Sequence, residues 1–276
     1  MTYAYGRVLR ACGGVLACGL ILTACSGAGD DGGKSGASTS PGSSGTSTAQ
    51  PTSAAPTPTP TGLAFTPDPK RAPKNAADAK KLALAIVAGP ESWGPDYVKR
   101  TPYLSGDSYW PVLDTGCTWE AGTRPATVLH NVTAYSEIPA AAGKGLLQVS
   151  ATVTVHRTET DADWEMAQTL EEVLRCPSQQ LRDGERITGL MSLGSPFGVG
   201  GNFTAADSLR EAGTYVNDAV KGEQTYSWYQ SRVGQITVAV VVKGAPGHIG
   251  KDLDRAQVQA LVAMVGRAED ALEVQS

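Results

Sequence analysis

The sequence predicts an α+β fold in which an antiparallel-dominated sheet packs with about three helices. Strand-like segments follow one another closely along the chain, and short connections between successive strands favour antiparallel pairing. One segment, residues 147–155, alternates apolar and polar residues with a period of two, which indicates one buried and one wetter sheet face. Three separate segments carry apolar residues at helical spacing. These patterns oppose a doubly wound parallel sheet.

The first helix is expected over residues 76–87, where alanine, leucine and isoleucine recur at helical spacing. Asn75 is a suitable N-cap, and Gly89 followed by Pro90 ends the run because neither residue continues a helix readily. Residues 90–126 are rich in glycine, proline and aromatic residues, so we expect long irregular structure there.

Two strands and a second helix follow. The strands are expected at residues 127–135 and 147–155. Thr160 and Asp163 resemble a capping box at the start of the helix, and Pro177 stops it. Five residues are expected to line its buried face: Trp164, Ala167, Leu170, Val173 and Leu174.

The strongest β signal is a hairpin that joins residues 224–233 to residues 236–242. Gly234 is the first residue of its two-residue loop and suits a type II′ turn. Further strands are expected at residues 186–193 and, with a weaker pattern, at residues 213–220. The fold is thus built largely from strands that pair with their neighbours in the chain.

The final helix is expected over residues 253–272. Asp252 and Asp254 lie at its positive N-terminus, where the helix dipole favours acidic side chains. Six residues form its apolar face: Val258, Leu261, Val262, Val265, Ala268 and Leu272.

The N-terminal segment has the parts of a bacterial secretion signal. Arg7 and Arg10 precede a short apolar stretch, and residues 22–25 (Leu-Thr-Ala-Cys) look like a lipobox. The apolar stretch is about half of the roughly 20 residues that span a bilayer. We expect removal of residues 1–24 and acylation of Cys25, palmitate included. The alternative is a plain secretory signal with a chance cysteine.

The segment after this cysteine is predicted to be a disordered tether. Residues 26–75 are rich in serine, threonine, glycine, alanine and proline, with too few large apolar residues to offset the entropy of ordering. A coil of this length has a root-mean-square span of about 40 Å. The domains are therefore a signal peptide (1–24), a lipidated N-terminus and linker (25–75) and a folded extracytoplasmic domain (76–276).

Cys117 and Cys176 remain once the three cysteines of the first 25 residues are set aside. In an oxidising compartment such a pair is expected to form a disulfide. The bridge would close a loop of about 60 residues and contribute roughly 4 kcal/mol in the chain-entropy model. Two separately buried thiols are the alternative, and no histidine or carboxylate at ligand spacing indicates zinc.

The charge balance argues against a nucleic-acid partner. The formal net charge is −4, and loss of the two signal arginines moves it to −6. A mildly acidic protein has no overall field that attracts nucleic acid or anionic lipid headgroups. We therefore expect the membrane contact to come from the N-terminal lipid, and a small ligand or an envelope protein to be the further partner.

The motifs give no catalytic, metal or cofactor site. His130, His156 and His248 show no ligand spacing, and the chain lacks the Gly-x-Ser-x-Gly elbow of a serine nucleophile. The glycine-rich loop at 194–201 lacks the Lys-Ser/Thr ending of a P-loop and the dinucleotide-binding spacing. We expect no catalytic residue, no metal and no cofactor.

The aromatic residues of the hairpin are the candidates for ligand binding. Tyr226 and Trp228 share one face of a strand, and Tyr229 points the opposite way. Burial of Tyr226 and Trp228 in the core is the competing expectation. Glu171 and Glu172 are expected on a solvated helix face rather than in a catalytic pair.

The folded part resembles actinobacterial lipoproteins similar to the sensor domain of PknH-type receptor kinases. Three strings carry the resemblance: Cys117-Thr118-Trp119, Leu174-Arg175-Cys176-Pro177 after the Trp164 helix, and the hairpin at 232–241. Domains of that type have two disulfides, and this chain has cysteines for one. The resemblance implies a central antiparallel sheet, no enzymatic activity and a cleft for a small ligand.

The first functional hypothesis is a membrane-anchored, non-enzymatic, sensor-like or ligand-binding lipoprotein on the outer face of the plasma membrane. The alternatives are a carrier for lipid or another apolar molecule and a cell-envelope hydrolase. A continuous apolar cavity would favour the carrier, and a polar cleft would favour the sensor. A buried serine or carboxylate with a shifted pKa beside a cleft would favour the enzyme.

Cys25→Ser tests the lipid anchor. Labelled fatty acid should enter the wild-type protein and not the variant, because serine offers no thiol for acylation, and the variant should lose stable membrane attachment. Fatty-acid labelling followed by membrane fractionation measures both. Labelling of Cys25→Ser at the wild-type level would remove the lipoprotein interpretation.

Overall fold

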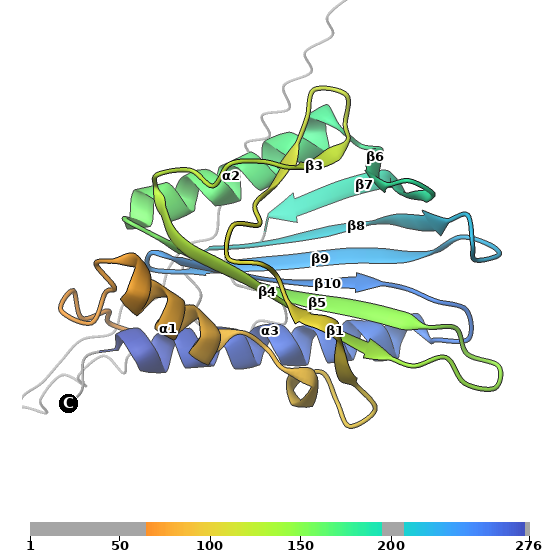
Figure 1. The fold of residues 1–276 in the computed structure, drawn as a ribbon, viewed down its shortest axis with the longest axis horizontal. Coiled ribbons are helices and arrows are strands. Elements are labelled where there is room, and N and C mark those ends of the chain that lie inside the picture. Colours follow the sequence, from red (N-terminus) through yellow and green to blue (C-terminus); the bar gives the residue numbers. More distant parts are fainter. Residues whose placement is uncertain (1–64, 195–206, 274–276) are drawn as a thin grey trace, which may run out of the picture. The chain divides into compact units, whose positions relative to one another are not determined.

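The computed structural model describes residues 65–194 and 207–273; the predicted signal, Cys25 and most of the predicted linker and glycine-rich loop lie outside these residues. The described residues form three α-helices, one 3₁₀ turn and ten strands (Figure 1). In chain order these are α1 (Ala76–Ile86), η1 (Pro90–Ser92), β1 (Val98–Leu104), β2 (Pro111–Leu113), β3 (Trp119–Ala121), β4 (Val128–Ile138), β5 (Leu147–His156), α2 (Glu159–Arg175), β6 (Gln179–Arg182), β7 (Glu185–Gly194), β8 (Asp207–Asn217), β9 (Gln224–Val233), β10 (Ile236–Lys243) and α3 (Gly250–Leu272).

The main sheet has eight strands in the order β1-β4-β5-β10-β9-β8-β7-β6, and every neighbouring pair is antiparallel. Strands β2 and β3 form a separate two-stranded sheet. The predicted hairpin is present, with Val233 opposite Ile236. Gly234 has a φ of +55°, a conformation that favours glycine. The predicted α+β class with an antiparallel sheet is confirmed.

Helices α1 and α3 cover one face of the sheet, which we call the core face (Figure 1). On α3, Leu261, Met264 and Val265 are fully buried. Alternate residues of β10 meet them with at most 1% exposure: Ile236, Val238, Val240 and Val242. Burial of each such side chain contributes about 1.5–3 kcal/mol, so most of the hydrophobic stabilisation is on this face.

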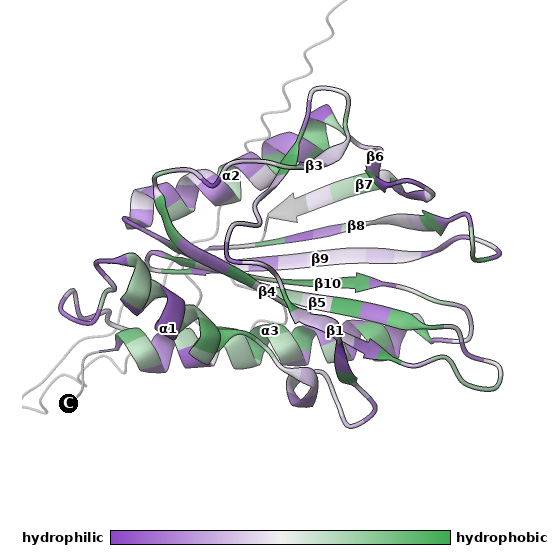
Figure 2. Ribbon diagram, in the orientation of Figure 1, coloured by the Kyte–Doolittle hydropathy of each residue, from purple (hydrophilic) through white to green (hydrophobic). Residues whose placement is uncertain are grey.

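Helix α2 lies against the opposite face, which we call the pocket face. Glu165 of α2 accepts hydrogen bonds from Gln230 Nε2 at 2.8 Å and from Thr237 Oγ1 at 2.9 Å. Gln230 and the core residue Tyr229 point to opposite sides of β9, so α2 and α3 cover opposite faces. In Figure 2, β10 is largely hydrophobic, whereas the neighbouring β9 is mostly neutral or hydrophilic.

The start of α2 differs from the prediction by two residues. Thr158 is the N-cap: its hydroxyl accepts a hydrogen bond from the Asp161 backbone N–H, and the Asp161 carboxylate accepts one from the Thr158 backbone N–H. The predicted capping residues, Thr160 and Asp163, belong to the helix itself. Both pairs have the same spacing, so the sequence pattern alone did not distinguish them.

The predicted buried face of α2 is wrong for most of its members. Trp164 is 69% exposed and Leu174 is 84% exposed, and only Val173 of the predicted set is buried. The buried residues are Ala162, Met166 and Val173. The side of α2 that contacts the pocket face includes polar residues, so a hydrophobic stripe does not mark it.

Five strands depart from the predicted pattern; among them, β2 and β3 lie in the segment expected to be irregular, and β6 was not predicted. Strand β1 lies in the segment that we expected to be irregular, and it contains Pro102. It is an edge strand that pairs with β4 through an irregular register, and an edge tolerates proline. Strand β8 runs from Asp207 to Asn217, whereas the prediction covered residues 213–220. The charged Arg210 and Glu211 interrupt the apolar pattern, so the predicted start was six residues too late.

Residues 65–75, assigned to the linker by composition, contact the folded domain where the structure describes them. Phe65 packs against the main core. The carbonyl oxygen of Pro73 accepts a hydrogen bond of 3.2 Å from Gln235 Nε2. Among the described helices, none is both long and apolar enough to cross a membrane.

Gln257 connects α3 to the centre of the sheet. Its side chain is fully buried. Its Nε2 donates hydrogen bonds to the carbonyl oxygens of Ser227 at 3.1 Å and Val240 at 2.8 Å, and its Oε1 accepts one from the Ser227 hydroxyl. A buried amide satisfied on both sides fixes how the helix sits on β9 and β10.

Gln257→Ala should lower the free energy of unfolding by about 2–4 kcal/mol, because it opens a cavity and removes three hydrogen bonds. Gln259→Ala is the matched control: Gln259 is exposed on the same helix, and the change should cost under about 0.5 kcal/mol. Urea denaturation measures both. Equal effects of the two substitutions would contradict the buried role of Gln257.

Candidate functional site

A pocket of about 420 Å³ lies between the pocket face of the sheet and a cover formed by α2, the β2–β3 hairpin and nearby chain. Strands β4, β5, β8, β9 and β10 supply the floor: Asn131, Thr133, Tyr135, Ser150, Thr152, Thr154, Glu211, Tyr226, Trp228, Gln230, Val241 and Lys243. The cover and its surroundings supply Tyr109, Trp110, Pro111, Trp119, Glu165, Gln168, Thr169, Glu172, Val173 and Gln179. Arg100, Leu181 and Arg182 complete the lining.

The strand register sets the order of side chains across the floor. One row contains Tyr135, Ser150, Val241, Trp228 and Glu211, which are successive cross-strand partners. Directly paired residues in antiparallel strands share a face, so all five side chains are on the pocket side. The row runs from an aromatic phenol, through small and apolar groups, to an indole and a carboxyl group.

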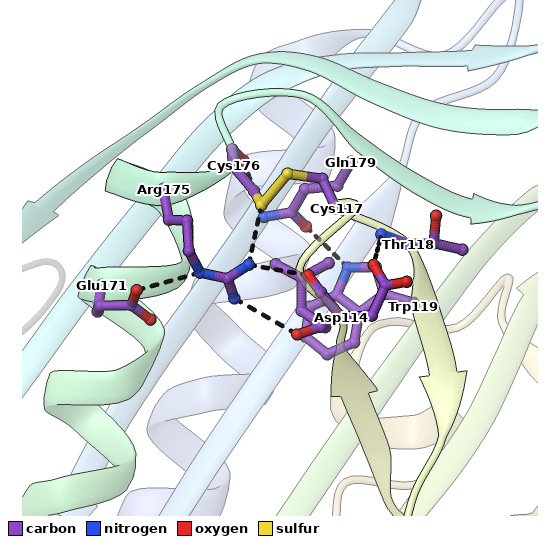
Figure 3. Close-up of a disulfide and its surroundings, with 9 residues drawn as sticks. Asp114, Cys117, Thr118, Trp119, Glu171, Arg175, Cys176 and Gln179 are labelled. Carbon is purple, nitrogen blue, oxygen red and sulfur yellow. Dashed lines mark hydrogen bonds and ion pairs between the residues drawn. A yellow bond between two sulfur atoms is a disulfide. The ribbon is translucent and has the colours of Figure 1, made fainter.

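The predicted disulfide is present and lies within the cover (Figure 3). Cys117, in the β2–β3 hairpin, is joined to Cys176 at the end of α2, with Cα atoms 5.5 Å apart. Two hydrogen bonds join the same two segments: Trp119 Nε1 donates to Gln179 Oε1 at 2.8 Å, and the Gln180 N–H donates to the Cys117 carbonyl at 2.8 Å. The hairpin is therefore fixed to the α2–β6 junction.

Arg175 strengthens the same junction (Figure 3). Its guanidinium donates to the carbonyl oxygen of Asp114 at 2.8 Å and to Glu171 Oε1 at 3.1 Å. The Asp114 carboxylate in turn accepts a 2.7 Å hydrogen bond from the Thr118 N–H and holds the hairpin turn. Because Trp119 and Gln179 line the pocket, this network positions part of its wall.

Glu211 is the most unusual group in the pocket. It is 5% exposed, and its Oε1 has no hydrogen-bond partner within the part of the chain that the structure describes. Burial, with a smaller contribution from Glu172, raises the pKa of Glu211 to about 8. Burial also raises the pKa of Glu172, although Gln168 Nε2 donates a 2.9 Å hydrogen bond to it. A buried, unpartnered carboxyl group therefore faces this cavity.

Asn131 leaves a second acceptor without a partner. Its side chain is 3% exposed and its Nδ2 donates to the carbonyl oxygen of Tyr109 at 3.0 Å. Its Oδ1 has no hydrogen-bond partner among residues 65–194 and 207–273. Of the buried side-chain atoms without a partner in the described residues, those of Glu211 and Asn131 are the two that line the pocket, where a polar ligand or water can satisfy them.

The three cationic side chains that line the pocket are Arg100, Arg182 and Lys243. Lys243 Nζ lies 3.1 Å from Glu185 Oε2, and Arg182 Nε donates to Glu185 Oε1 at 2.7 Å. Burial alone would raise the pKa of Glu185, but Arg182 and Lys243 together hold it below its usual range. The Arg100 guanidinium stacks 4.9 Å from the centre of the Tyr135 ring. Two of the three cations are thus committed to a carboxylate.

The structure places both candidate aromatic residues at the pocket. Tyr226 is 7% exposed and Trp228 is half-buried, and both line the cavity. They also pack with a small apolar cluster that includes Val173 and Val241, so pocket lining and burial coincide. Tyr229, on the opposite side of the strand, belongs to the main core as the alternation requires.

The remaining predicted residues do not gather at the pocket. His130 and His156 are buried in strands, and His248 lies in a turn, where its Nε2 is 3.0 Å from the Gly145 carbonyl oxygen. His156 Nε2 pairs with Glu165 at 2.8 Å, which fixes one end of α2. Within the described residues, no three His, Cys, Asp or Glu side chains are grouped to ligate a metal.

Sequence reasoning missed Glu211 and misplaced Glu172. Glu171 is exposed, as expected for a solvated face, whereas Glu172 is half-buried and lines the pocket. The signal for Glu211 was its position: Leu209, Glu211 and Tyr215 share one side of a strand. A carboxylate on an otherwise apolar strand face is a marker of a site, once the strand is recognised.

No protein-family model and no curated protein matches the chain. Among solved structures, one match is the extracellular domain of PknH from Mycobacterium tuberculosis, with a TM-score of 0.46 and 11% sequence identity. The match covers 73% of this chain and 98% of that chain. It is a domain of the type that the three sequence strings resemble.

Removal of the disulfide by Cys117→Ala with Cys176→Ala should lower the free energy of unfolding by about 2–5 kcal/mol, because the bridge constrains a long loop of the unfolded chain. Non-reducing peptide mapping should recover Cys117 linked to Cys176 in the wild type. Denaturation of the wild-type protein with and without reductant compares the bridged and unbridged states without a mutation. Two freely alkylating thiols in oxidised, folded protein would contradict the bridge.

Proposed function

We propose that this domain is a non-enzymatic, sensor-like lipoprotein module that binds a small ligand in the pocket. Lipidated Cys25 and the Ser/Thr/Pro-rich segment would hold it on the outer face of the plasma membrane. The observation that carries the proposal is the pocket with two buried acceptors, on Glu211 and Asn131, that have no partner in the described residues.

The disulfide supports the proposed location. Such bonds form and persist in oxidising compartments and are rare in the cytosol. The Cys117–Cys176 bridge also fastens the pocket cover, so an oxidising environment would stabilise the site itself. The lipobox-like residues 22–25 supply an anchor for the same side of the membrane.

A carrier for lipid or another apolar molecule fits the lining less well. The middle of the floor has hydroxyl and amide side chains on neighbouring strands, among them Thr152, Thr154 and Gln230. An acyl chain would also leave the buried acceptors Glu211 Oε1 and Asn131 Oδ1 without hydrogen-bond partners, which costs free energy. The lining favours a ligand that carries polar groups.

A cell-envelope hydrolase is the second candidate, and Glu211 is the observation that favours it. A carboxyl group with a pKa of about 8 beside a cleft has a property of general acids. Among the described residues, however, its Oε1 has no partner that would orient it or relay a proton. If the protein hydrolysed an ester or a glycoside and Glu211→Gln abolished that activity, the hydrolase would replace the ligand-binding module as the proposed function.

Native mass spectrometry of mature protein from its own host tests the proposal. The wild type should retain a small molecule as additional mass. Ser150 lies in the middle of the floor, so Ser150→Trp should fill the cavity and remove that mass. Ser150→Ala is the matched control and should retain it, because it leaves the cavity open.

Circular dichroism should show that the three proteins fold alike. A wild type that carries no additional mass in several preparations would count against the proposal. So would a Ser150→Trp variant that keeps the same mass as the wild type.

A further inference from the structure

We propose that the pocket selects ligands that carry a cationic amine, with the ammonium group beside Glu211 and Glu172 and against the aromatic rings of Tyr226 and Trp228. This inference rests on the proposed ligand-binding function and names the chemical class of its ligand. It concerns the end of the pocket that β8, β9 and α2 form.

The first support is the geometry around Glu211. In the strand register it lies directly opposite Trp228 on one side and Ser192 on the other. The Glu172 carboxyl group approaches from α2 and interacts with it electrostatically. The buried Glu211 and the half-buried Glu172 line the same pocket, so a bound cation would relieve both their repulsion and the desolvation of Glu211.

The second support is the aromatic surface. Tyr226 and Trp228 line the cavity next to Glu211, and their rings present negative faces that attract ammonium groups. Burial raises the pKa of Tyr226, so its phenol stays protonated and adds no charge at neutral pH. Aromatic walls of this kind are the surroundings in which proteins hold quaternary ammonium ligands.

The third support is that the protein's own cations do not neutralise this end. Lys243 and Arg182 pair with Glu185, and Arg175 pairs with Glu171 outside the pocket. The Arg100 guanidinium stacks on Tyr135 of β4, and β5, β10 and β9 separate that strand from β8. No ion pair of Glu211 occurs within residues 65–194 and 207–273.

Binding of a cation should therefore depend on pH. Glu211 is largely protonated below its pKa of about 8 in the empty pocket, and the ionised form binds a cation better. Glu172 from α2 and Tyr226 from β9 are the titratable groups that interact with it. Affinity should rise with pH up to about 8 and then level off, with a proton released on binding below pH 8.

Choline and its uncharged isostere 3,3-dimethylbutan-1-ol are suitable probes, because they differ chiefly in charge and choline does not titrate in this range. Isothermal titration calorimetry would use the full mature chain in a maltoside detergent. Choline affinity should rise about tenfold from pH 6 to pH 7, because ionisation of one group with a pKa near 8 limits it. The alcohol should bind at least tenfold more weakly at pH 8, with no pH dependence.

Three variants distinguish the effect of the pocket carboxyl groups on choline binding from the effect of the net charge. Glu211→Gln should weaken choline binding to the level of the alcohol and remove its pH dependence. Glu172→Gln should move the pH profile to lower pH, because it removes the repulsion that raises the pKa of Glu211. Glu223→Gln changes the net charge by the same amount at an exposed turn and should leave both unchanged.

Equal affinity for choline and the alcohol, or a flat pH profile in the wild type, would overturn the inference; neither result requires a variant to fold. If neither probe binds but Ser150→Trp loses a native ligand mass, the amine class is wrong and the proposed function stands. If neither probe binds and the wild type retains no mass, both proposals fail.

Discussion

The period-two alternation of the central strands is the constraint on which this structure depends. It sends the valines and isoleucines of β10 to α1 and α3, where they form the main core. The opposite side is left with threonine, serine, asparagine and glutamine on the middle strands. Apolar contact with α2 on this face includes the small cluster around Val173 and Val241, and polar bonds supply the rest of the attachment.

The cover is accordingly held by specific bonds. Glu165 ties one end of α2 to β5, β9 and β10 through His156, Gln230 and Thr237. The disulfide at Cys176 ties the other end to the β2–β3 hairpin. Between these two attachments the helix and the sheet need not pack tightly, and the pocket occupies that interval.

Much of the fold could be predicted from local pattern, because most strands pair with their neighbours in the chain and the long helices have clear limits. The side of α2 that faces the sheet could not, because the polar contacts of Glu165 and Thr169 interrupt its apolar residues. Trp164 and Leu174 suggested a buried stripe and are exposed instead. The first six residues of β8 were missed for a related reason, because the charged Arg210 and Glu211 interrupt the apolar pattern of the strand.

Glu211 could not be predicted either, because its burial destabilises the folded state. A pKa of about 8 in place of 4.5 means that this group destabilises the folded state by roughly 3 kcal/mol at pH 7. The sign follows from the raised pKa: the folded state holds the proton more tightly, so this contribution grows as pH rises from about 4.5 to 8. Local rules that describe stable folds do not anticipate a group of this kind.

The division of the sheet into two faces also has an evolutionary consequence. Neighbouring residues of β9, such as Trp228 and Tyr229, point into different layers, so their side chains pack in separate apolar clusters. Mutations on the pocket face can therefore accumulate without erosion of the core. The scaffold can diversify in what it recognises while it keeps its architecture, as binding loops do on other folds, but here within regular strands.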